Sequence, residues 1–304
     1  SVVVDRGSGL PARFDETQAA LIEDATWIGV EYVRTIEQIE SEGPARLGVP
    51  SEQVQPGGFL LWGDSHAATL THMMDSTASR LGRQGFVALR GGTPPIPGLW
   101  HSGMPNSQEF NDAVMRFIDR QQIADVILVS RWAVYVSGFS QWDPKFDGRR
   151  NEDVYLSDSD QRSVTGTESL QAMQRKMGDL IDRLKEKGVR VWLLQQVPSQ
   201  KSLVAESAVR NMLLGADINK IRATNREAHR KHQAAVRGLY DSATSGIRET
   251  GGDILDPANV LFGDDGNGLL MANGRYTYRD DDHLSKSGAE LLAPMLRQAM
   301  EPMP

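Results

Sequence analysis

A serine lies at a position where its surroundings favour nucleophilic chemistry. Ser65 follows the apolar run 59–62 in the order Gly-Asp-Ser-His, and an amphipathic, helix-type segment begins directly after it. At a strand-to-helix turn of this kind the serine is exposed at the sheet edge, and outward-pointing backbone N–H groups can hold a developing oxyanion. The alternative is that Asp64 or Ser65 is only a helix N-cap, since both residue types favour that position.

A second chemically capable segment lies near the C-terminus, where Asp280, Asp281 and Asp282 precede His283. The spacing Asp-x-x-His places the Asp280 carboxylate close enough to accept a hydrogen bond from one imidazole nitrogen. The other nitrogen then stays free to take a proton from a serine. Two alternatives are a solvated acidic loop with a surface histidine and a weak cation site, because consecutive carboxylates suit calcium or magnesium. The regular Asp/Asn/Gly spacing of a calcium loop is missing.

Alternating apolar strands and amphipathic helices must position these two segments. Short apolar runs predict buried strands, and the stretches between them carry apolar residues at helical spacing. This order predicts a doubly wound parallel sheet with right-handed crossovers, in which ligands bind at the carboxyl ends of the strands. The five predicted strands are centred on residues 59–62, 86–89, 126–129, 189–194 and 253–255.

Further elements flank this pattern. Residues 1–14 predict an extended linker, and apolar residues at three- and four-residue spacing predict one helix over residues 15–42. The last helix is expected to begin with a capping box formed by Ser287 and Glu290.

The composition excludes several classes of function. The chain has 304 residues, a formal net charge of -7 and no cysteine. The acidic balance disfavours nucleic acid and anionic lipid as partners. The absence of cysteine rules out a disulfide scaffold, thiolate metal sites and a cysteine nucleophile. No apolar run is long enough to span a bilayer, and because the first residue is Ser1 rather than Met we expect a fragment or processed chain, which leaves room for a targeting or membrane segment upstream.

Taken together, the two polar segments resemble the SGNH (GDSL-type) hydrolase superfamily, over most of residues 55–304. The resemblance is closer to the SGNH domains fused to membrane acyltransferase-3 proteins. It is carried by Leu-Leu-Trp-Gly-Asp-Ser-His-Ala (60–67), Val-Ile-Leu-Val-Ser-Arg-Trp (126–132) and Asp-His-Leu-Ser-Lys-Ser-Gly-Ala (282–289). Residues 9–14 also resemble the segment that joins the membrane part to the SGNH part.

The resemblance implies a fold and a set of roles. The fold is a three-layer, flavodoxin-like α/β domain with a central parallel five-stranded sheet and an N-terminal helical extension. Residues 1–50 would be the linker and extension, and residues 51–304 the catalytic domain. Ser65 would be the nucleophile and first oxyanion donor, His283 the base and Asp280 its orienter.

The remaining oxyanion donors are less well defined by the resemblance. The second block of the superfamily supplies a glycine after the second strand, where this chain has Gly91 and Gly92. The third block normally supplies an asparagine, but this chain has Ser-Arg-Trp at residues 130–132. We expect Gly92, Arg131 and Trp132 to serve the oxyanion or the substrate. The Arg131 side chain could replace the lost donor, pair with an acidic neighbour or bind substrate.

The resemblance also implies a function. By this resemblance the chain would be the extracytoplasmic domain of a bacterial polysaccharide O-acetyltransferase, of the kind that modifies lipopolysaccharide O-antigen. It would lie at the periplasmic face of the inner membrane. An acyltransferase-3 transmembrane domain of the same full-length chain would pass on acetyl groups from acetyl-CoA. The SGNH domain itself would bind no cofactor. Acetyl-Ser65 would then transfer the acetyl group to a sugar hydroxyl of the polysaccharide acceptor. The alternatives are a free-standing carbohydrate acetylesterase and a non-catalytic glycan-binding module. Only the missing asparagine favours the last.

Other histidines are expected to be outside the chemistry. His229 and His232 lie one turn apart in a Lys/Arg-rich helical segment. Without a third ligand nearby they predict a solvated helix face rather than a metal site, and we expect no metal. His66 is too close along the chain to Ser65 to act as its base, and a structural or surface role is expected.

Overall fold

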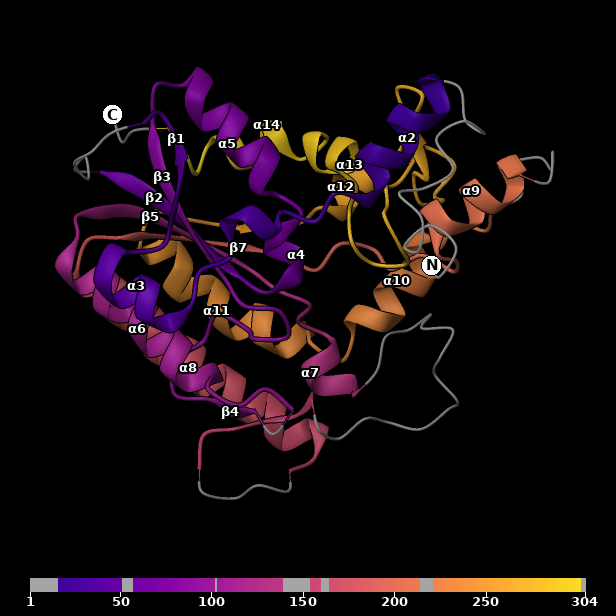
Figure 1. Cartoon of the computed structure of the whole chain (residues 1–304). Coiled ribbons are helices and arrows are strands. Elements are labelled where there is room, and N and C mark those ends of the chain that lie inside the picture. Colours follow the sequence, from indigo (N-terminus) through magenta and orange to yellow (C-terminus); the bar gives the residue numbers. More distant parts are fainter. Residues whose placement is uncertain are drawn as a thin grey trace.

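The computed structural model describes residues 16–50, 57–101, 103–138, 154–159, 164–213 and 221–301. Its centre is a six-stranded sheet in the order β1-β3-β2-β5-β7-β8 (Figure 1). All neighbouring strands are parallel except β1, which runs antiparallel to β3. The strands are β1 (Ala45–Gly48), β2 (Gly58–Gly63), β3 (Gln84–Leu89), β5 (Ile123–Val129), β7 (Arg190–Leu194) and β8 (Ile254–Leu255).

The predicted fold class is confirmed, with one strand added. The five predicted strands are parallel and follow the flavodoxin-like order, in which the second strand lies outside the first. Strand β1 was not predicted because it has only four residues and follows Pro44 directly. Its buried residues, Ala45 and Leu47, alternate with the exposed Arg46, as expected for an edge strand.

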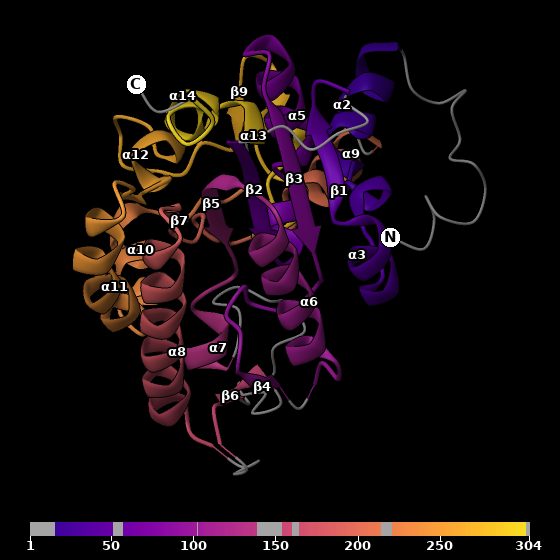
Figure 2. The ribbon, with the colours of Figure 1, turned by 90° about the vertical axis from the view of Figure 1, so that its left-hand side faces the viewer.

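Helices cover both faces of the sheet, and the period-two alternation of β2 shows how the two layers divide. Leu60 and Trp62 belong to the core cluster beneath α3, α6, α8 and α11, whereas Phe59 and Leu61 belong to the cluster beneath α5, α13 and α14. Figures 1 and 2 show these two helical layers on opposite sides of the strands. Their bounds are α3 (Ile36–Glu42), α5 (Thr71–Arg80), α6 (Ser107–Arg120), α8 (Gly166–Glu186), α11 (Arg237–Glu249), α13 (Lys286–Glu290) and α14 (Ala293–Arg297).

The predicted single helix over residues 15–42 is wrong. The segment forms α2 (Glu16–Thr26), a 3-10 turn (Val30–Tyr32) and α3. Gly29 interrupts it with a φ of 64°, a left-handed conformation that favours glycine, and Thr35 then starts α3 with a capping box. The linker expected over residues 1–14 lies outside the described residues.

Helix α2 is tied to the sheet domain through α13. The hydroxyl of Ser287 donates to Asp24 of α2 at 2.7 Å, and the Ser287 backbone N–H donates to the same oxygen at 3.1 Å. The prediction that Ser287 caps the last helix is therefore wrong. The predicted last helix divides into α13 and α14, and Ser285 is the N-cap of α13: its hydroxyl accepts from the Gly288 N–H at 2.9 Å. The boundary near residue 50 stays a prediction.

Shorter elements complete the chain. The Lys/Arg-rich helical segment that carries His229 and His232 forms α10, and α11 follows it; residues 214–220 lie outside the described residues. In the described part of the chain, every helix is too short or too polar to cross a bilayer. The other elements are α4 (Ser65–Ala68), α7 (Val134–Ser137), α9 (Val204–Leu213), α10 (Arg226–Gln233), α12 (Ala258–Leu261) and the pairs β4 (Trp100–His101) with β6 (Leu156–Ser157) and β9 (Met271–Ala272) with β10 (Arg275–Tyr276).

Candidate active site

Ser65, His283 and Asp280 form a continuous line of hydrogen bonds beyond the carboxyl end of β2. The Nε2 atom of His283 is 2.8 Å from Ser65 Oγ, and its Nδ1 atom is 2.9 Å from Asp280 Oδ2. Ser65 is the first residue of α4, and His283 lies in the loop before α13. The structure thus brings together the three side chains that the sequence singled out, in an order suited to nucleophilic catalysis.

Asp64 fixes the turn that presents the serine. Its side chain caps α4 by accepting from the His66 N–H at 2.9 Å, so Asp64 is the N-cap and the Ser65 hydroxyl is left to face His283. The carboxylate is 1% exposed and ties this turn to the segment after β5. Its Oδ2 atom accepts hydrogen bonds from Ser130 Oγ (2.6 Å), the Arg131 N–H (2.9 Å) and Tyr135 Oη (3.1 Å).

Asp280 shapes the loop as well as holding the imidazole. Its Oδ1 atom accepts from the backbone N–H groups of Asp282 (3.0 Å) and His283 (2.7 Å). The Arg279 N–H also donates to the His283 carbonyl at 2.9 Å. A short aspartate side chain that bonds nearby backbone N–H groups stabilises a tight turn. This is the local reason why the Asp-x-x-His spacing aims the ring at its own carboxylate.

Charge within the cluster favours an ionised Asp280 and a strongly basic His283. Burial opposes the charged form of both groups, but their mutual hydrogen bonds and attraction outweigh it. The pKa of Asp280 is lowered. The pKa of His283 is raised to about 10, because the Asp280 and Asp282 carboxylates both stabilise the imidazolium.

The sequence contained no signal for two side chains that contact the His283 ring. Asp282 is 2% exposed, and its Oδ1 atom is 3.0 Å from His283 Nδ1. The His66 ring centroid is 4.7 Å from that of His283, and His66 is buried rather than at the surface. The Asp-x-x-His spacing predicted that Asp280 faces the ring, but the run of three aspartates contained no signal that Asp282 faces it as well.

The three residues expected at the oxyanion or substrate site have different surroundings. Gly92 adopts a φ of 65° in the turn after β3 and packs against Met104; no described contact joins it to Ser65. The guanidinium of Arg131 pairs with Asp282, its Nε lying 2.5 Å from Oδ2. This contact matches the expected alternative of an acidic partner.

Trp132 does not line the site surface. Its side chain is fully buried in the core, and its indole N–H donates to the Leu194 carbonyl at 2.8 Å. A ring enclosed in this way cannot stack on a sugar. The sequence placed Trp132 correctly after a strand but contained no signal for the direction of its side chain.

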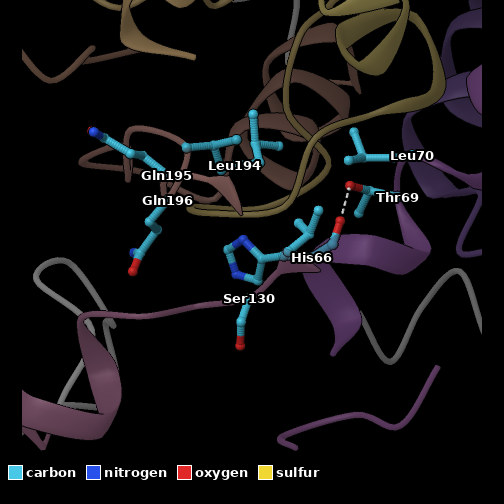
Figure 3. Close-up of a pocket in the computed structure, with 9 residues that line it drawn as sticks. His66, Thr69, Leu70, Ser130, Leu194, Gln195 and Gln196 are labelled. Atoms are coloured by element: carbon cyan, nitrogen blue, oxygen red, sulfur yellow. Dashed lines mark hydrogen bonds between the residues drawn. The ribbon is translucent and has the colours of Figure 1, made fainter. Parts of the chain in front are cut away.

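His66 borders a small cavity between the ends of β5 and β7 (Figure 3). Ser130 and Gln196 line the same cavity, and Thr69 Oγ1 donates to the His66 carbonyl at 2.8 Å. Ligand atoms of His66, Asp282 and His283 lie within 4.8 Å of one another, as a cation site would require. Because Asp282 is already paired with Arg131, we interpret this cluster as a network of side-chain contacts.

The expectation of a solvated face for His229 and His232 is wrong. Both lie on α10 and are only 9% and 8% exposed. Burial lowers the pKa of each to about 4, assisted at His229 by Arg226 and at His232 by His229 and Arg131. The His229 ring packs on Phe262, with 5.6 Å between centroids, a long-range contact that a Lys/Arg-rich helix does not signal.

A flavodoxin-like sheet with a Ser–His–Asp line beyond its first parallel strand is the architecture of SGNH-type hydrolases. The family model described as the SGNH domain (fused to AT3 domains) matches residues 34–298. The chain belongs to this family of SGNH domains fused to AT3 domains. No curated relative matches the chain.

The solved structures that are similar to this chain include the two described next. The periplasmic domain of the lipopolysaccharide acetyltransferase of Salmonella ser. Paratyphi A is 16% identical, over 80% of this chain and 83% of that chain, with a TM-score of 0.50. At this identity the similarity shows the shared fold. An acetyl xylan esterase is 12% identical, over 80% of this chain and 100% of that chain, with a TM-score of 0.39.

Proposed function

We propose that this chain is the extracytoplasmic domain of a bacterial cell-surface polysaccharide O-acetyltransferase, and that Ser65 carries the acetyl group to a sugar hydroxyl. The observation that carries the proposal is the line from Ser65 through His283 to Asp280, in a chain of the AT3-fused SGNH family. The similar Salmonella structure is the periplasmic domain of a lipopolysaccharide acetyltransferase. This supports our proposal that the present chain lies on the periplasmic side of the membrane and acts on a cell-surface polysaccharide.

The geometry supports a two-step transfer. His283 Nε2 takes the proton from Ser65 Oγ as that oxygen attacks the carbonyl carbon of an acetyl donor, and the donor's leaving group departs with a proton from the imidazolium. The backbone N–H of Ser65 faces the developing oxyanion. In the second step His283 removes the proton of a sugar hydroxyl, whose oxygen attacks acetyl-Ser65. The acetyl–sugar ester forms, and the serine recovers its proton from His283.

The donor would reach this domain through its fusion partner. In the proposed full-length protein, the acyltransferase-3 membrane domain passes acetyl groups outward from acetyl-CoA, and the SGNH domain delivers them to the glycan. The SGNH domain would then need no cofactor of its own, because the acetyl group arrives already activated.

A carbohydrate acetylesterase is the second candidate. The Ser65–His283 contact at 2.8 Å would serve water as acceptor equally well, since His283 would deprotonate water in place of a sugar hydroxyl. The non-catalytic alternative has less support, because a glycan-binding module has no need of a serine, histidine and aspartate in hydrogen-bond contact.

Substitution of Ser65 by alanine tests the nucleophile. After incubation with 4-nitrophenyl acetate, the wild-type chain is expected to carry one acetyl group on the peptide that contains Ser65, detected by mass spectrometry. Ser65→Ala should lose this adduct and lower the acylation rate about a thousand-fold or more. Ser41→Ala, at an exposed serine of α3, should behave as wild type. An unmodified wild type, or an identical adduct on Ser65→Ala, would exclude this nucleophile.

Addition of an acceptor separates transfer from hydrolysis. With an oligosaccharide of the O-antigen type present, a transferase should release acetyl-sugar in place of free acetate. An esterase should release acetate at the same rate with or without the sugar.

The acylation rate is expected to rise with pH well beyond neutrality. His283 must be neutral to accept the serine proton, and its pKa is raised to about 10, so the reactive fraction grows as pH increases toward that value. Single-turnover acylation, corrected with Ser65→Ala for background, checks this. A rate that levels off near pH ~6.5, the ordinary pKa of histidine, would contradict it.

A further inference from the structure

We propose that Arg131, Asp282 and His66 form a positioning group for the base, in which Asp282 is a second carboxylate acceptor for His283 and Arg131 holds that carboxylate in place. The inference rests on the proposed function, since it concerns how the base of that site is held. The contacts that carry it join three parts of the chain: α4, the segment after β5, and the loop before α13.

The Nδ1 atom of His283 faces two carboxylates. Asp280 Oδ2 lies 2.9 Å away and Asp282 Oδ1 lies 3.0 Å away. Ionised carboxylates only accept hydrogen bonds, so the proton of the neutral imidazole belongs on Nδ1, where its hydrogen bond goes to Asp280 and Asp282 lies in ion-pair contact. The lone pair of Nε2 is thereby directed at Ser65 Oγ, 2.8 Å away. Either carboxylate alone would select this tautomer.

The surroundings of Asp282 favour its ionised form. Burial raises the cost of its charge, but the contacts with His283 and His66 and the charge of Arg131 outweigh this and hold its pKa well below the usual range. Asp282 is fully enclosed, at 2% exposure, and its second oxygen lies 2.5 Å from Arg131 Nε. A buried carboxylate with a fixed cation on one oxygen has little freedom to turn the other away from the imidazole.

Arg131 also joins the two halves of the site. Its backbone N–H donates to Asp64 at 2.9 Å, and Asp64 sets the turn of Ser65. Its guanidinium holds Asp282, which faces the base. One residue after β5 therefore locates both the nucleophile turn and the base loop, which are separated by more than two hundred positions in sequence.

His66 closes the remaining side of the base. Its ring is tilted by 42° to that of His283, with 4.7 Å between centroids. Its Nε2 atom is 3.7 Å from Asp282 Oδ2. Since His66 is 4% exposed, it excludes water from this side of Asp282 and limits rotation of the His283 ring.

The titratable and charged groups around His283 come from four elements. Asp280, Asp281, Asp282 and Arg279 lie in its own loop, and His66 lies on α4. Arg131 approaches from the segment after β5, and the neutral His232 approaches from α10. The two carboxylates in contact with the ring raise the pKa of His283, and Arg131 opposes them by neutralising Asp282. Removal of Asp282 and removal of Arg131 should therefore shift this pKa in opposite directions.

Acylation by 4-nitrophenyl acetate in single turnover tests whether the carboxylates share one task. Asp280→Asn and Asp282→Asn each leave one carboxylate on Nδ1 and should each slow acylation about ten- to a hundred-fold. The double variant should be slower than the product of the two effects predicts, since both acceptors are then lost. A purely structural Asp282 would give an effect that multiplies simply with that of Asp280→Asn, and this outcome would overturn the proposal.

Heteronuclear NMR of the His283 imidazole nitrogens across pH gives a second readout that needs no turnover. Asp282→Asn should lower the pKa of His283 by on the order of one unit. Arg131→Met should raise it, and Arg131→Lys, which keeps the charge, should restore a value near wild type. Asp281→Asn, in the same loop, is the matched control for a general loss of charge and should shift it less than Asp282→Asn.

The outcomes of the titration are decisive on their own. An unchanged His283 pKa in Asp282→Asn, or shifts of the same sign in Asp282→Asn and Arg131→Met, would overturn the proposal. If Asp282→Asn does not fold, the comparison of Arg131→Met with Arg131→Lys decides instead. Failure of the wild type to acquire acetyl on Ser65 would count against the proposed function, while the titration would still decide how His283 is held.

Discussion

Gly63→Ala is expected to destabilise the protein strongly and to displace the nucleophile turn. Gly63 is the last residue of β2, and an added Cβ would lie 1.8 Å from the carbonyl oxygen of Val129 and 2.9 Å from the Cβ of Ala67. The first contact is with backbone of the neighbouring strand β5, which cannot rotate away. The cost in free energy of unfolding should be about 3 kcal/mol, at the upper end for overpacked sites.

Chemical denaturation of Gly63→Ala, with single-turnover acylation of the folded fraction, checks this prediction. Gly178→Ala is the matched control, because nothing lies within 4 Å of an added Cβ in the middle of α8. Alanine favours the helix there, so this variant should be more stable by up to about 1 kcal/mol. Equal stability of the two variants, with normal acylation in Gly63→Ala, would be incompatible with the close approach of β2 to β5.

The parts of this structure that could be predicted from sequence are those with a local signal. Buried parallel strands are continuous apolar runs, and four of the five predicted strands overlap clear runs of this kind, from Phe59 to Leu194. The Asp-x-x-His segment could be found because Asp280 bonds backbone and ring within a single turn. The meeting of that segment with Ser65 could be expected from the order of the strands, and the resemblance added the roles.

The parts that could not be predicted depend on what another segment covers. His232 reads as a solvated helix residue until α10 is seen with its inner face buried. Trp132 reads as a loop aromatic until its indole is seen bonded to β7. The helix breaks at Gly29, whose conformation is left-handed. Because a single glycine is often tolerated within a helix, the sequence pattern does not show whether the helix continues, and the tertiary contact at Gly29 decides this. There, a Cβ would meet the carbonyl oxygen of Ala68 at 2.9 Å.

The segment after β5 holds the site together from within. In place of the superfamily's asparagine it has three side chains that each bond to another part of the protein. Ser130 donates to Asp64, Arg131 pairs with Asp282, and Trp132 donates to the carbonyl end of β7. All three contacts join elements that carry or border the triad. In this chain the departure from the superfamily pattern therefore coincides with contacts that tie the segment after β5 to Asp64, Asp282 and β7.

Asp64→Asn is expected to impair both stability and acylation, because all of the donors around this carboxylate require an acceptor. The Oδ1 atom receives the His66 N–H, and Oδ2 receives three donors, including the Arg131 N–H at 2.9 Å. An asparagine has one carbonyl oxygen, so either orientation of its amide sets an NH₂ group against a backbone N–H. Since Asp64 is 1% exposed, water cannot relieve the conflict. The loss should be about 2–4 kcal/mol of unfolding free energy, from two or more charge-assisted hydrogen bonds.

The acylation rate of Asp64→Asn should fall further than its stability alone explains, because Ser65 and Arg131 are both located by this carboxylate. Denaturant unfolding and single-turnover acylation, measured under conditions where the variant is folded, separate the two effects. Tyr135→Phe removes one donor and leaves the other three contacts of Asp64 intact, so it should cost only about 1 kcal/mol and retain most of the acylation rate. Asp75→Asn is a second control, because that side chain accepts from the Gly48 N–H through Oδ1, which an amide oxygen can replace. An Asp64→Asn variant as stable and as active as these controls would mean that the carboxylate does not locate the nucleophile turn.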